Sequence, residues 1–294
     1  MQKLRTIITL LFCFSLSAGC VSAKPVEREP VTVKAMTYNI WSNISGEKLT
    51  KLIDASGVGI ISLQEIGNGK RLDEAAELLG EEWTALYPGC DTPELKQPPG
   101  RRPNFWIGGH HMPAALITKY EVVEYQFYNI TDTPEDWIDA RLIECYRSCL
   151  RARLKIGEDT YVNVFSLHGN PWNGEWRIRE FRDVIGQLED YHADDPTIIL
   201  GDFNAVPHTD NPEDPNDAKS TRLLTDAGFI DTFRKVKPDA EKHPGKTNES
   251  GRIDHIYTRN FDKIVKSFVV AEPTFGSLDK DSDHQPLFSE LLIK

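Results

Sequence analysis

A carboxylate and an amide, two residues apart, follow a short apolar run near the middle of this chain. The run is 198–200, and Gly201-Asp202-Phe203-Asn204 follows it. Residues i and i+2 of an extended segment lie on the same face, so Asp202 and Asn204 can reach one ligand. Their oxygens suit a hard divalent cation or a phosphate group held beside one. Gly, Asp and Asn also favour ordinary turns, so these residues alone leave a turn and a site as alternatives.

Five other segments place similar side chains where a strand is expected to begin or end. They are Asn39 after 31–38, Glu65 after 58–63, His168 after 161–167, Asp254 within 253–257, and Asp283 with His284 before 287–293. Each of these has a structural explanation when taken alone, as a turn residue, a cap or a solvated strand end. Their recurrence at strand ends predicts that they converge on one edge of a sheet sandwich.

Carboxylates, amides and histidines in one place are typical of phosphoester hydrolysis. A divalent cation neutralises the phosphate oxygens that repel hydroxide, and charge stabilisation and positioning then dominate catalysis. An imidazole with a pKa near 6.5 accepts a proton from water near neutral pH. A buried carboxylate beside that imidazole fixes its tautomer and stabilises the imidazolium.

Apolar periodicity predicts the elements that position these side chains. Helices are expected at 47–55, 72–79, 175–191 and 221–227, and strands at 31–38, 58–63, 114–118, 122–127, within 141–156, and at 161–167, 198–200, 253–257, 264–270 and 287–293. In the longest helix, Ile178, Phe181, Ile185 and Leu188 share one face, and Arg177 lies mostly off it. Helices alternating with strands, together with consecutive strands, predict an α/β fold with two packed mixed sheets and helices outside. The acidic run 210–217 is expected to form a solvated loop.

Residues 1–23 are typical of a signal peptide, with two basic residues before an apolar stretch and small residues at its end. Cleavage before Cys20 would leave a lipid-anchored cysteine, and cleavage before Lys24 would leave a soluble protein. Residues 24–30 are then a short linker, and 31–294 form one domain. Either reading predicts an exported bacterial protein, which would be periplasmic, extracellular or a membrane-anchored lipoprotein.

The net charge limits the classes of partner, and the cysteine content limits the possible disulfides. The formal net charge of -11 disfavours broad electrostatic capture of a polyanion. An oxidising compartment permits one disulfide among Cys90, Cys145 and Cys149, and the pairing stays open. We expect a monomer.

The motifs together resemble the endonuclease/exonuclease/phosphatase superfamily, which includes DNase I-like nucleases, inositol polyphosphate 5-phosphatases and neutral sphingomyelinases. The matching segments are Thr-Tyr-Asn-Ile-Trp at 37–41, Gln-Glu at 64–65, Leu-His at 167–168, Gly-Asp-Phe-Asn at 201–204, Arg-Ile-Asp-His-Ile at 252–256 and Ser-Asp-His at 282–284. The resemblance implies a DNase I-like four-layer α/β sandwich. It also implies Mg²⁺-dependent phosphoester hydrolysis, with Mn²⁺ or Ca²⁺ as substitutes.

The resemblance assigns the metal and the base to five residues. Glu65 would bind the metal with Asn39 beside it, and Asp283 would help to bind it or hold the neighbouring histidine. His284 would be the general base, oriented by Asp254. The number of metal ions stays open.

The same resemblance assigns the phosphate contacts. Asp202 would position the water or aid the leaving group, Asn204 would hold the phosphate, and His168 would donate to the phosphoryl oxygens. Trp172, four residues past His168, is the aromatic side chain expected to line the cleft and contact substrate.

The substrate stays open among a small molecule, a lipid headgroup and a nucleic acid. An extracellular DNase I-like nuclease is the main alternative, although this chain lacks the arginine that such members tend to carry two residues after Glu65. A non-catalytic binding protein of the same fold is the third reading. Retention of both a base and its acid partner argues against it, because binding alone does not require such a pair.

Overall fold

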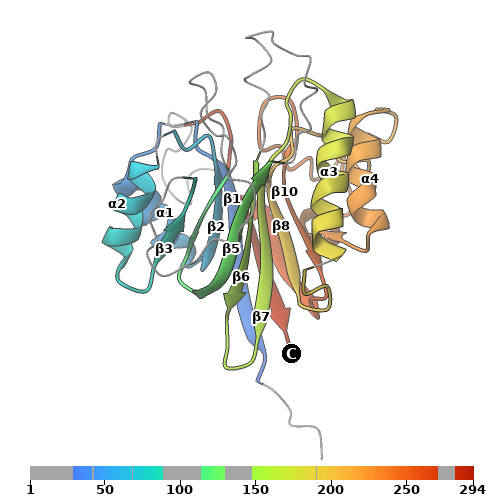
Figure 1. The fold of residues 1–294 in the computed structure, drawn as a ribbon. Helices are drawn as coiled ribbons and strands as arrows, with labels where there is room; N and C mark the ends of the chain where they lie inside the picture. The colour runs from blue at the N-terminus through green and yellow to red at the C-terminus, as the bar shows by residue number, and fades with distance from the viewer. Residues whose placement is uncertain are drawn as a thin grey trace, which may run out of the picture.

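The computed structural model describes residues 29–41, 43–67, 69–88, 114–129, 148–189, 191–270 and 282–294, and the statements below concern this part of the chain. Two six-stranded sheets form its centre (Figure 1). Sheet I has the strand order β11-β12-β1-β2-β4-β3, and sheet II has the order β5-β6-β7-β8-β10-β9. The strands are β1 (Val31–Asn39), β2 (Ile60–Gln64), β3 (Thr84–Leu86), β4 (Ala115–Thr118), β5 (Glu121–Asn129), β6 (Ser148–Lys155), β7 (Tyr161–His168), β8 (Thr197–Asp202), β9 (Ile230–Asp231), β10 (Asp254–Arg259), β11 (Lys263–Val269) and β12 (Leu287–Ile293).

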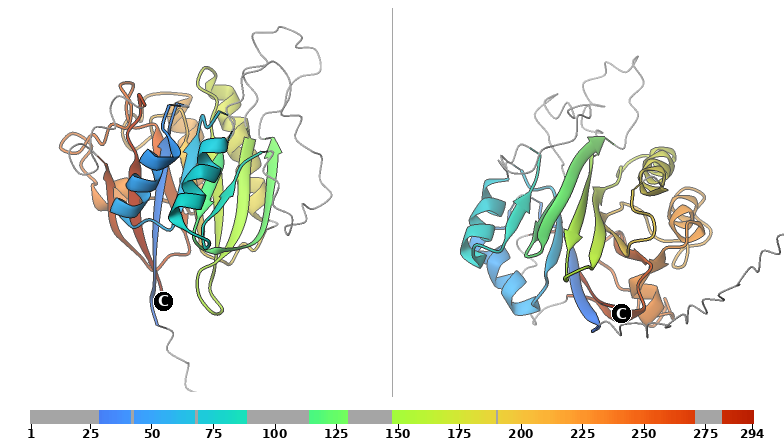
Figure 2. Two further views of the ribbon diagram at one scale, coloured as in Figure 1. Left: turned by 90° about the vertical axis from the view of Figure 1, so that its left-hand side faces the viewer. Right: turned by 60° about the horizontal axis from the view of Figure 1, so that its bottom comes forward.

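Helices cover the outer faces of both sheets. The helices α1 (Gly46–Ser56) and α2 (Lys70–Leu79) pack on sheet I, and α3 (Gly174–Glu189) and α4 (Asp217–Asp226) pack on sheet II. Figure 2 shows the helix pairs on opposite sides of the two sheets. A short helix, α5 (Thr232–Val236), follows β9. The predicted four-layer α/β sandwich is confirmed.

Alternation along the strands builds three apolar layers. On β1, Val33 and Ala35 face the core between the sheets, whereas Met36 and Tyr38 face α1 and α2. Both sides of this strand are therefore buried, as expected for a central strand of a sandwich covered by helices. A third cluster joins sheet II to α3 and α4, with Phe181 at its centre.

Strand direction brings the predicted site residues to one edge. β1 runs parallel to β2 and pairs Asn39 with Gln64, and β7 runs parallel to β8 and pairs His168 with Asp202. The antiparallel β10 begins at this edge, because its first residue, Asp254, pairs with Asp202. The polar ends of both sheets therefore meet where the strands stop.

Two charged residues depart from the sequence predictions. Most of the run 210–217 is exposed, as expected, but Asp210 is largely buried and accepts hydrogen bonds from Arg234 and Arg252. Arg177 was placed off the buried face of α3, but it is 7 % exposed and pairs with Asp217 of α4. Buried charges must be paired, and these pairs join segments that local patterns treat separately.

The structure describes one of the three cysteines at positions 90, 145 and 149. Cys149 is a free, buried thiol, and burial raises its pKa to about 12. Cys90 and Cys145 lie outside the described residues, as do residues 1–28 with the expected leader and Cys20. Among the described helices, none has the length and apolar character needed to cross a membrane.

Candidate active site

A buried histidine–carboxylate pair lies at the centre of the strand-end edge. Nδ1 of His284 is 2.7 Å from Oδ2 of Asp254. Asp254 is fully buried, and its backbone N–H donates to the hydroxyl of Thr247. The carboxylate holds the ring through Nδ1, so Nε2 is the nitrogen that faces the other site residues.

The segment that carries His284 is tied to β1. The backbone N–H of His284 donates to the hydroxyl of Ser282, which in turn donates to the backbone oxygen of Asn39 over 2.6 Å. Burial alone would lower the pKa of His284, but the carboxylates of Asp254, Asp202 and Asp283 together raise it to about 10. The imidazole is therefore poised beside a strongly negative group of side chains.

Asp202 lies between the two histidines. Its Oδ2 atom is 3.7 Å from Nε2 of His284 and 3.5 Å from Nε2 of His168. Its Oδ1 atom accepts the backbone N–H of Asn204 over 2.8 Å. Burial, and then the nearby carboxylate of Asp254, raise the pKa of Asp202 well above its usual range. Two buried carboxylates this close together require a proton or a cation to balance them.

Asn39 bridges two carboxylates from different sheets. Its Nδ2 donates to Oε1 of Glu65 and to Oδ2 of Asp202, each over 3.0 Å. Oε1 of Glu65 is also 3.9 Å from Nε2 of His168. Glu65 has a φ of 56°, a left-handed conformation that costs energy for a residue with a long side chain. Such strain is typical of functional sites.

A second left-handed residue closes the end of β8. Asn204 has a φ of 49°, which asparagine adopts readily, and its Nδ2 donates to the backbone oxygen of Gly169 over 3.1 Å. A Cβ at Gly169 would lie 2.5 Å from the backbone oxygen of Phe203, so only glycine permits this approach. The ends of β7 and β8 are thereby locked together beneath Asn204.

Two predicted residues lie at the rim. The side chain of Asp283 is 56 % exposed, with Oδ1 4.0 Å from Nε2 of His284. Trp172 is 65 % exposed, and its backbone N–H donates to the side chain of the buried Asn170.

The structure thus brings together Asn39, Glu65, His168, Asp202, Asp254 and His284 in the interior of the site, with Asn204 beside them and Asp283 at the edge. Trp172 stands on the loop that follows His168.

Sequence reasoning assigned no role to three further residues of this region. Thr247 and Ser282 hold Asp254 and His284 in place, and Trp41 exposes 55 % of its surface two residues after Asn39. The backbone N–H of Trp41 donates to Oδ1 of Asn39. Trp41 and Ser282 lie within the motifs at 37–41 and 282–284, and this was the signal that could have marked them.

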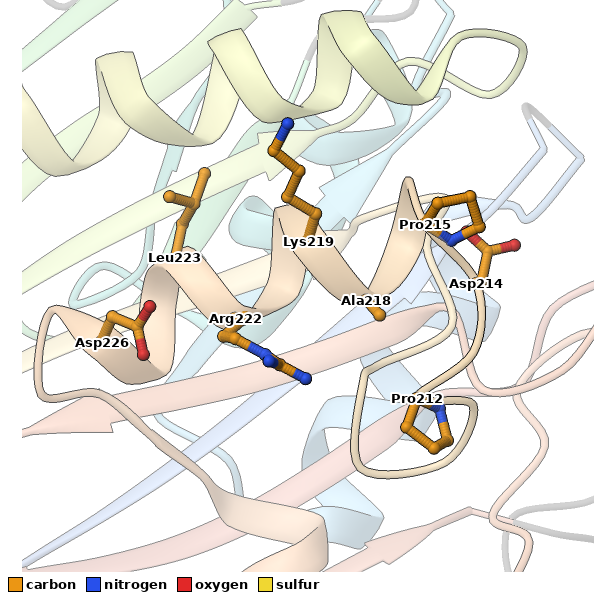
Figure 3. Close-up of a pocket in the computed structure, with 8 residues that line it drawn as sticks. All are labelled: Pro212, Asp214, Pro215, Ala218, Lys219, Arg222, Leu223 and Asp226. Atoms are coloured by element: carbon orange, nitrogen blue, oxygen red, sulfur yellow. The ribbon is translucent and has the colours of Figure 1, made fainter.

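Two cavities among the described residues lie away from this centre. The first, of about 270 Å³, is lined by α4 and the loop before it (Figure 3), through Pro212, Asp214, Pro215, Ala218, Lys219, Arg222, Leu223 and Asp226. The second, of about 580 Å³, lies at the turn between β10 and β11. That turn is the opposite end of β10 from Asp254. Neither cavity contains a predicted site residue.

Comparison with known proteins identifies the family. The sequence profile of the endonuclease/exonuclease/phosphatase family matches residues 36–284. The chain belongs to this family. No curated protein sequence matches it.

Solved structures of the endonuclease/exonuclease/phosphatase fold agree with this assignment. The family protein from Beutenbergia cavernae superposes with a TM-score of 0.62 at 18% identity, covering 89% of this chain and 71% of that one. D. rerio TDP2, complexed with a single-strand DNA product, gives 0.62 at 12% identity over 90% and 99%. ANGEL2, a 2',3'-cyclic phosphatase, gives 0.61 at 15% identity over 90% and 95%. At these identities the neighbours support the fold, and they differ among themselves in what they act on.

The donor atoms fit the divalent metal on which the endonuclease/exonuclease/phosphatase family depends. Ligand atoms of Asp202, Asp254 and His284 lie within 4.8 Å of one another. Oδ1 of Asp254 is buried without a hydrogen-bond partner among the described residues. Glu65 adds carboxylate oxygens nearby, and an excess of buried negative charge with oxygen donors suits a hard cation.

Proposed function

We propose that this protein is a Mg²⁺-dependent phosphoester hydrolase in which His284 activates water. The observation that carries this proposal is the 2.7 Å contact between His284 and Asp254, with Nε2 of His284 directed toward Asp202. Phosphoester hydrolysis is the chemistry of the family, and the residues of this site supply its base, its anion and its hydrogen-bond donors.

The cation is assigned to Glu65, Asn39 and Asp283. Nδ1 of His284 is already engaged with Asp254, and imidazole is a poor ligand for Mg²⁺, so His284 is left to act as the base. The carboxylates of Asp202 and Asp254 add to the negative charge that attracts the cation. Once bound, Mg²⁺ would neutralise the phosphate oxygens and the departing alkoxide. Mn²⁺ or Ca²⁺ would serve as substitutes.

The remaining roles follow from position. A bound cation would offset the carboxylates that raise the pKa of His284, so that the neutral imidazole can take the proton of water at Nε2. Asp254 holds the ring and stabilises its charged form. Asp202 orients the water or aids the leaving group, because its carboxylate lies between both imidazoles. Asn204 holds the phosphate, and His168 donates to the phosphoryl oxygens as negative charge develops on them.

The test is hydrolysis by purified protein with Mg²⁺ and with EDTA. Substrates would be bis-p-nitrophenyl phosphate, plasmid DNA, sphingomyelin and an inositol phosphate. His284→Ala should abolish turnover, and His192→Ala is the matched control, because that side chain is 42 % exposed and contacts Glu124 on β5 instead. Absence of activity on all four substrates with any divalent metal would overturn the proposal.

A nuclease is the second candidate, and the exposed tryptophans favour it. Trp41 and Trp172 are exposed and follow β1 and β7, the strands that carry Asn39 and His168 in the two sheets. An indole stacks on a nucleobase with about 1–3 kcal/mol per base. Trp172→Ala should then raise KM for DNA more than KM for an aliphatic phosphodiester. An equal effect on both substrates would count against stacking.

Export is part of the proposal. Residues 1–23 would direct it, with a lipid on Cys20 or a soluble protein beginning at Lys24. Mass spectrometry of the mature N-terminus, from protein expressed with its leader in a bacterial host, distinguishes the two. A protein that retains its leader in the cytoplasm would contradict both.

A further inference from the structure

On the inner faces of the strands, the side chains change from apolar to polar two residues before the site. On β7, Val164 belongs to the apolar core between the sheets, Ser166 is a fully buried hydroxyl, and His168 reaches the site. Thr37 stands in the same relation to Asn39 on β1. Because residues i and i+2 share a face, a polar layer lies between the apolar core and the site.

This layer is a continuous chain of hydrogen bonds. Thr37 Oγ1 donates to Oε1 of Gln64, and Nε2 of Gln64 donates to Oγ of Ser62 over 2.7 Å. The hydroxyls of Ser62 and Ser166 are 2.6 Å apart, and Ser166 donates to the backbone oxygen of Ala115 over 2.9 Å. Since Ser166 uses its single proton on Ala115, Ser62 is the donor between the two serines. We call Thr37, Gln64, Ser62 and Ser166 the inter-sheet hydroxyl chain.

Two bonds of this chain cross from one sheet to the other, and Ser62 has a second possible acceptor on sheet II. Ser62 of sheet I contacts Ser166 of sheet II, and Ser166 donates back to Ala115 of sheet I. Ser62 also lies 3.4 Å from the backbone oxygen of Leu200 on β8. Dispersion contacts between apolar faces have little directional preference, whereas hydrogen bonds require a narrow range of distance and angle. The chain therefore sets how the sheets lie against each other at this level.

The site above depends on that placement. Asn39 and Glu65 come from sheet I, and His168 and Asp202 come from sheet II. The 3.0 Å bond from Asn39 to Asp202 spans the two sheets directly above the chain. A small slide between the sheets would alter every distance across the site at once.

We propose that the inter-sheet hydroxyl chain is a positioning device that holds the two halves of the active site at working separation. Ser62 and Ser166 touch no substrate and act through Asn39, Glu65, His168 and Asp202. The inference rests on the hydrolase function proposed above. It gives the buried serines a role in turnover that packing alone would not require.

The double variant Ser62→Ala/Ser166→Ala tests this by removing both bonds that the serines make between the sheets. We expect kcat to fall about 10- to 100-fold with KM within about two-fold, because displacements near 1 Å cost rate while leaving binding groups in place. Thr50→Val/Thr197→Val is the matched control. Both hydroxyls are buried, but Thr50 donates to the backbone oxygen of Gly46 within α1 and Thr197 to that of Asp195 beside β8, so neither bond joins the two sheets. The control should keep kcat within about two-fold of the wild type, even if its unfolding temperature falls as much as that of the double serine variant.

The single variant Ser166→Ala covers the case in which the double variant does not fold. It keeps Ser62 with an acceptor on sheet II at Leu200, so kcat should fall less, by about 3- to 10-fold. A wild-type kcat in the variants, or an equal fall in the control, would overturn the inference.

A readout independent of turnover separates this inference from the hydrolase proposal. The ring resonances of His284 in heteronuclear NMR should move in the double variant and stay in place in the control, because His284 is distant in sequence from both serines but sits at the junction of the sheets. Unmoved resonances would overturn the inference even in an active protein. If the resonances move in the double variant and the wild type shows no hydrolytic activity, the hydrolase proposal is rejected and the positioning role remains supported.

Discussion

His284 and Asp254 approach to 2.7 Å across the two sheets, with His284 in the segment before β12 and Asp254 at the start of β10. Neither residue can adopt this arrangement through local structure, because 30 residues separate them. The contact exists only when both sheets are packed. It links the fold directly to the basicity of the imidazole.

Asp254→Asn should lower both the pKa of His284 and the turnover number. The carboxylate of Asp254 contributes most to the rise in the pKa of this imidazole to about 10, with smaller contributions from Asp202 and Asp283, so its removal lets burial pull the pKa down. The amide also no longer fixes the tautomer, and kcat should fall on the order of 10³- to 10⁴-fold, as in other histidine–carboxylate pairs. NMR titration of the ring gives the pKa. An unchanged pKa would show that Asp254 does not control the histidine.

Glu65→Gln should weaken Mg²⁺ binding by at least about ten-fold, because a neutral amide replaces a carboxylate beside Asn39 and Asp202. Isothermal titration with Mg²⁺ measures this without any substrate. Glu74→Gln on the exposed face of α2 is the control for the loss of one negative charge. Equal weakening in both variants would point to a diffuse electrostatic effect instead of a site.

Much of the fold follows from apolar periodicity, because strands buried on both faces and amphipathic helices leave clear patterns. All four long helices and the strands that carry site residues fall at or near their predicted positions. Strand-end logic also placed Asn39, Glu65, His168, Asp202 and His284 at one edge. The short β3, β9 and α5 were missed, since elements of two to five residues carry too little periodicity.

The supports of the site could not be predicted from local patterns. Ser282 donates to the backbone of Asn39 across 243 positions of sequence, and Thr247 reaches Asp254 from the loop before β10. In the sequence, nothing distinguished Asp210 from the other acidic residues of the loop expected at 210–217. Its partners Arg234 and Arg252 lie 24 and 42 residues away, and only tertiary packing reveals them.

Arg252→Met should destabilise the protein by about 3–5 kcal/mol. The guanidinium is fully buried and donates to both Asp210 and Asp231, and its loss leaves these carboxylates poorly compensated. Urea denaturation measures the change in free energy of unfolding. Lys266→Met is the control, because its pair with Glu290 is exposed and contributes about 0–1 kcal/mol. A loss below about 1 kcal/mol in Arg252→Met would show that the buried network contributes little.

His255 should make the protein less stable as pH falls from about 6.5 to 4. Its Nε2 faces the backbone oxygen of Ala205, and its Nδ1 faces the guanidinium of Arg252, so the ring is neutral with Nδ1 as acceptor. Burial, and then Arg252, lower its pKa to about 4, below the value near 6.5 of the unfolded chain. Between these values the unfolded state binds more protons, so the stabilisation is complete above pH 6.5 and is lost as pH falls through the folded pKa.

The measurement is the difference in free energy of unfolding between wild type and His255→Gln over this range. The raised pKa values of Asp202 and His284 give the free energy of unfolding a pH dependence of opposite sign. Because the wild type and His255→Gln share this contribution, subtracting one curve from the other removes it. The wild type should lose about 3 kcal/mol relative to the variant between pH 7 and pH 4, from about 1.4 kcal/mol per pKa unit. Parallel curves for the two proteins would show that His255 does not titrate on unfolding.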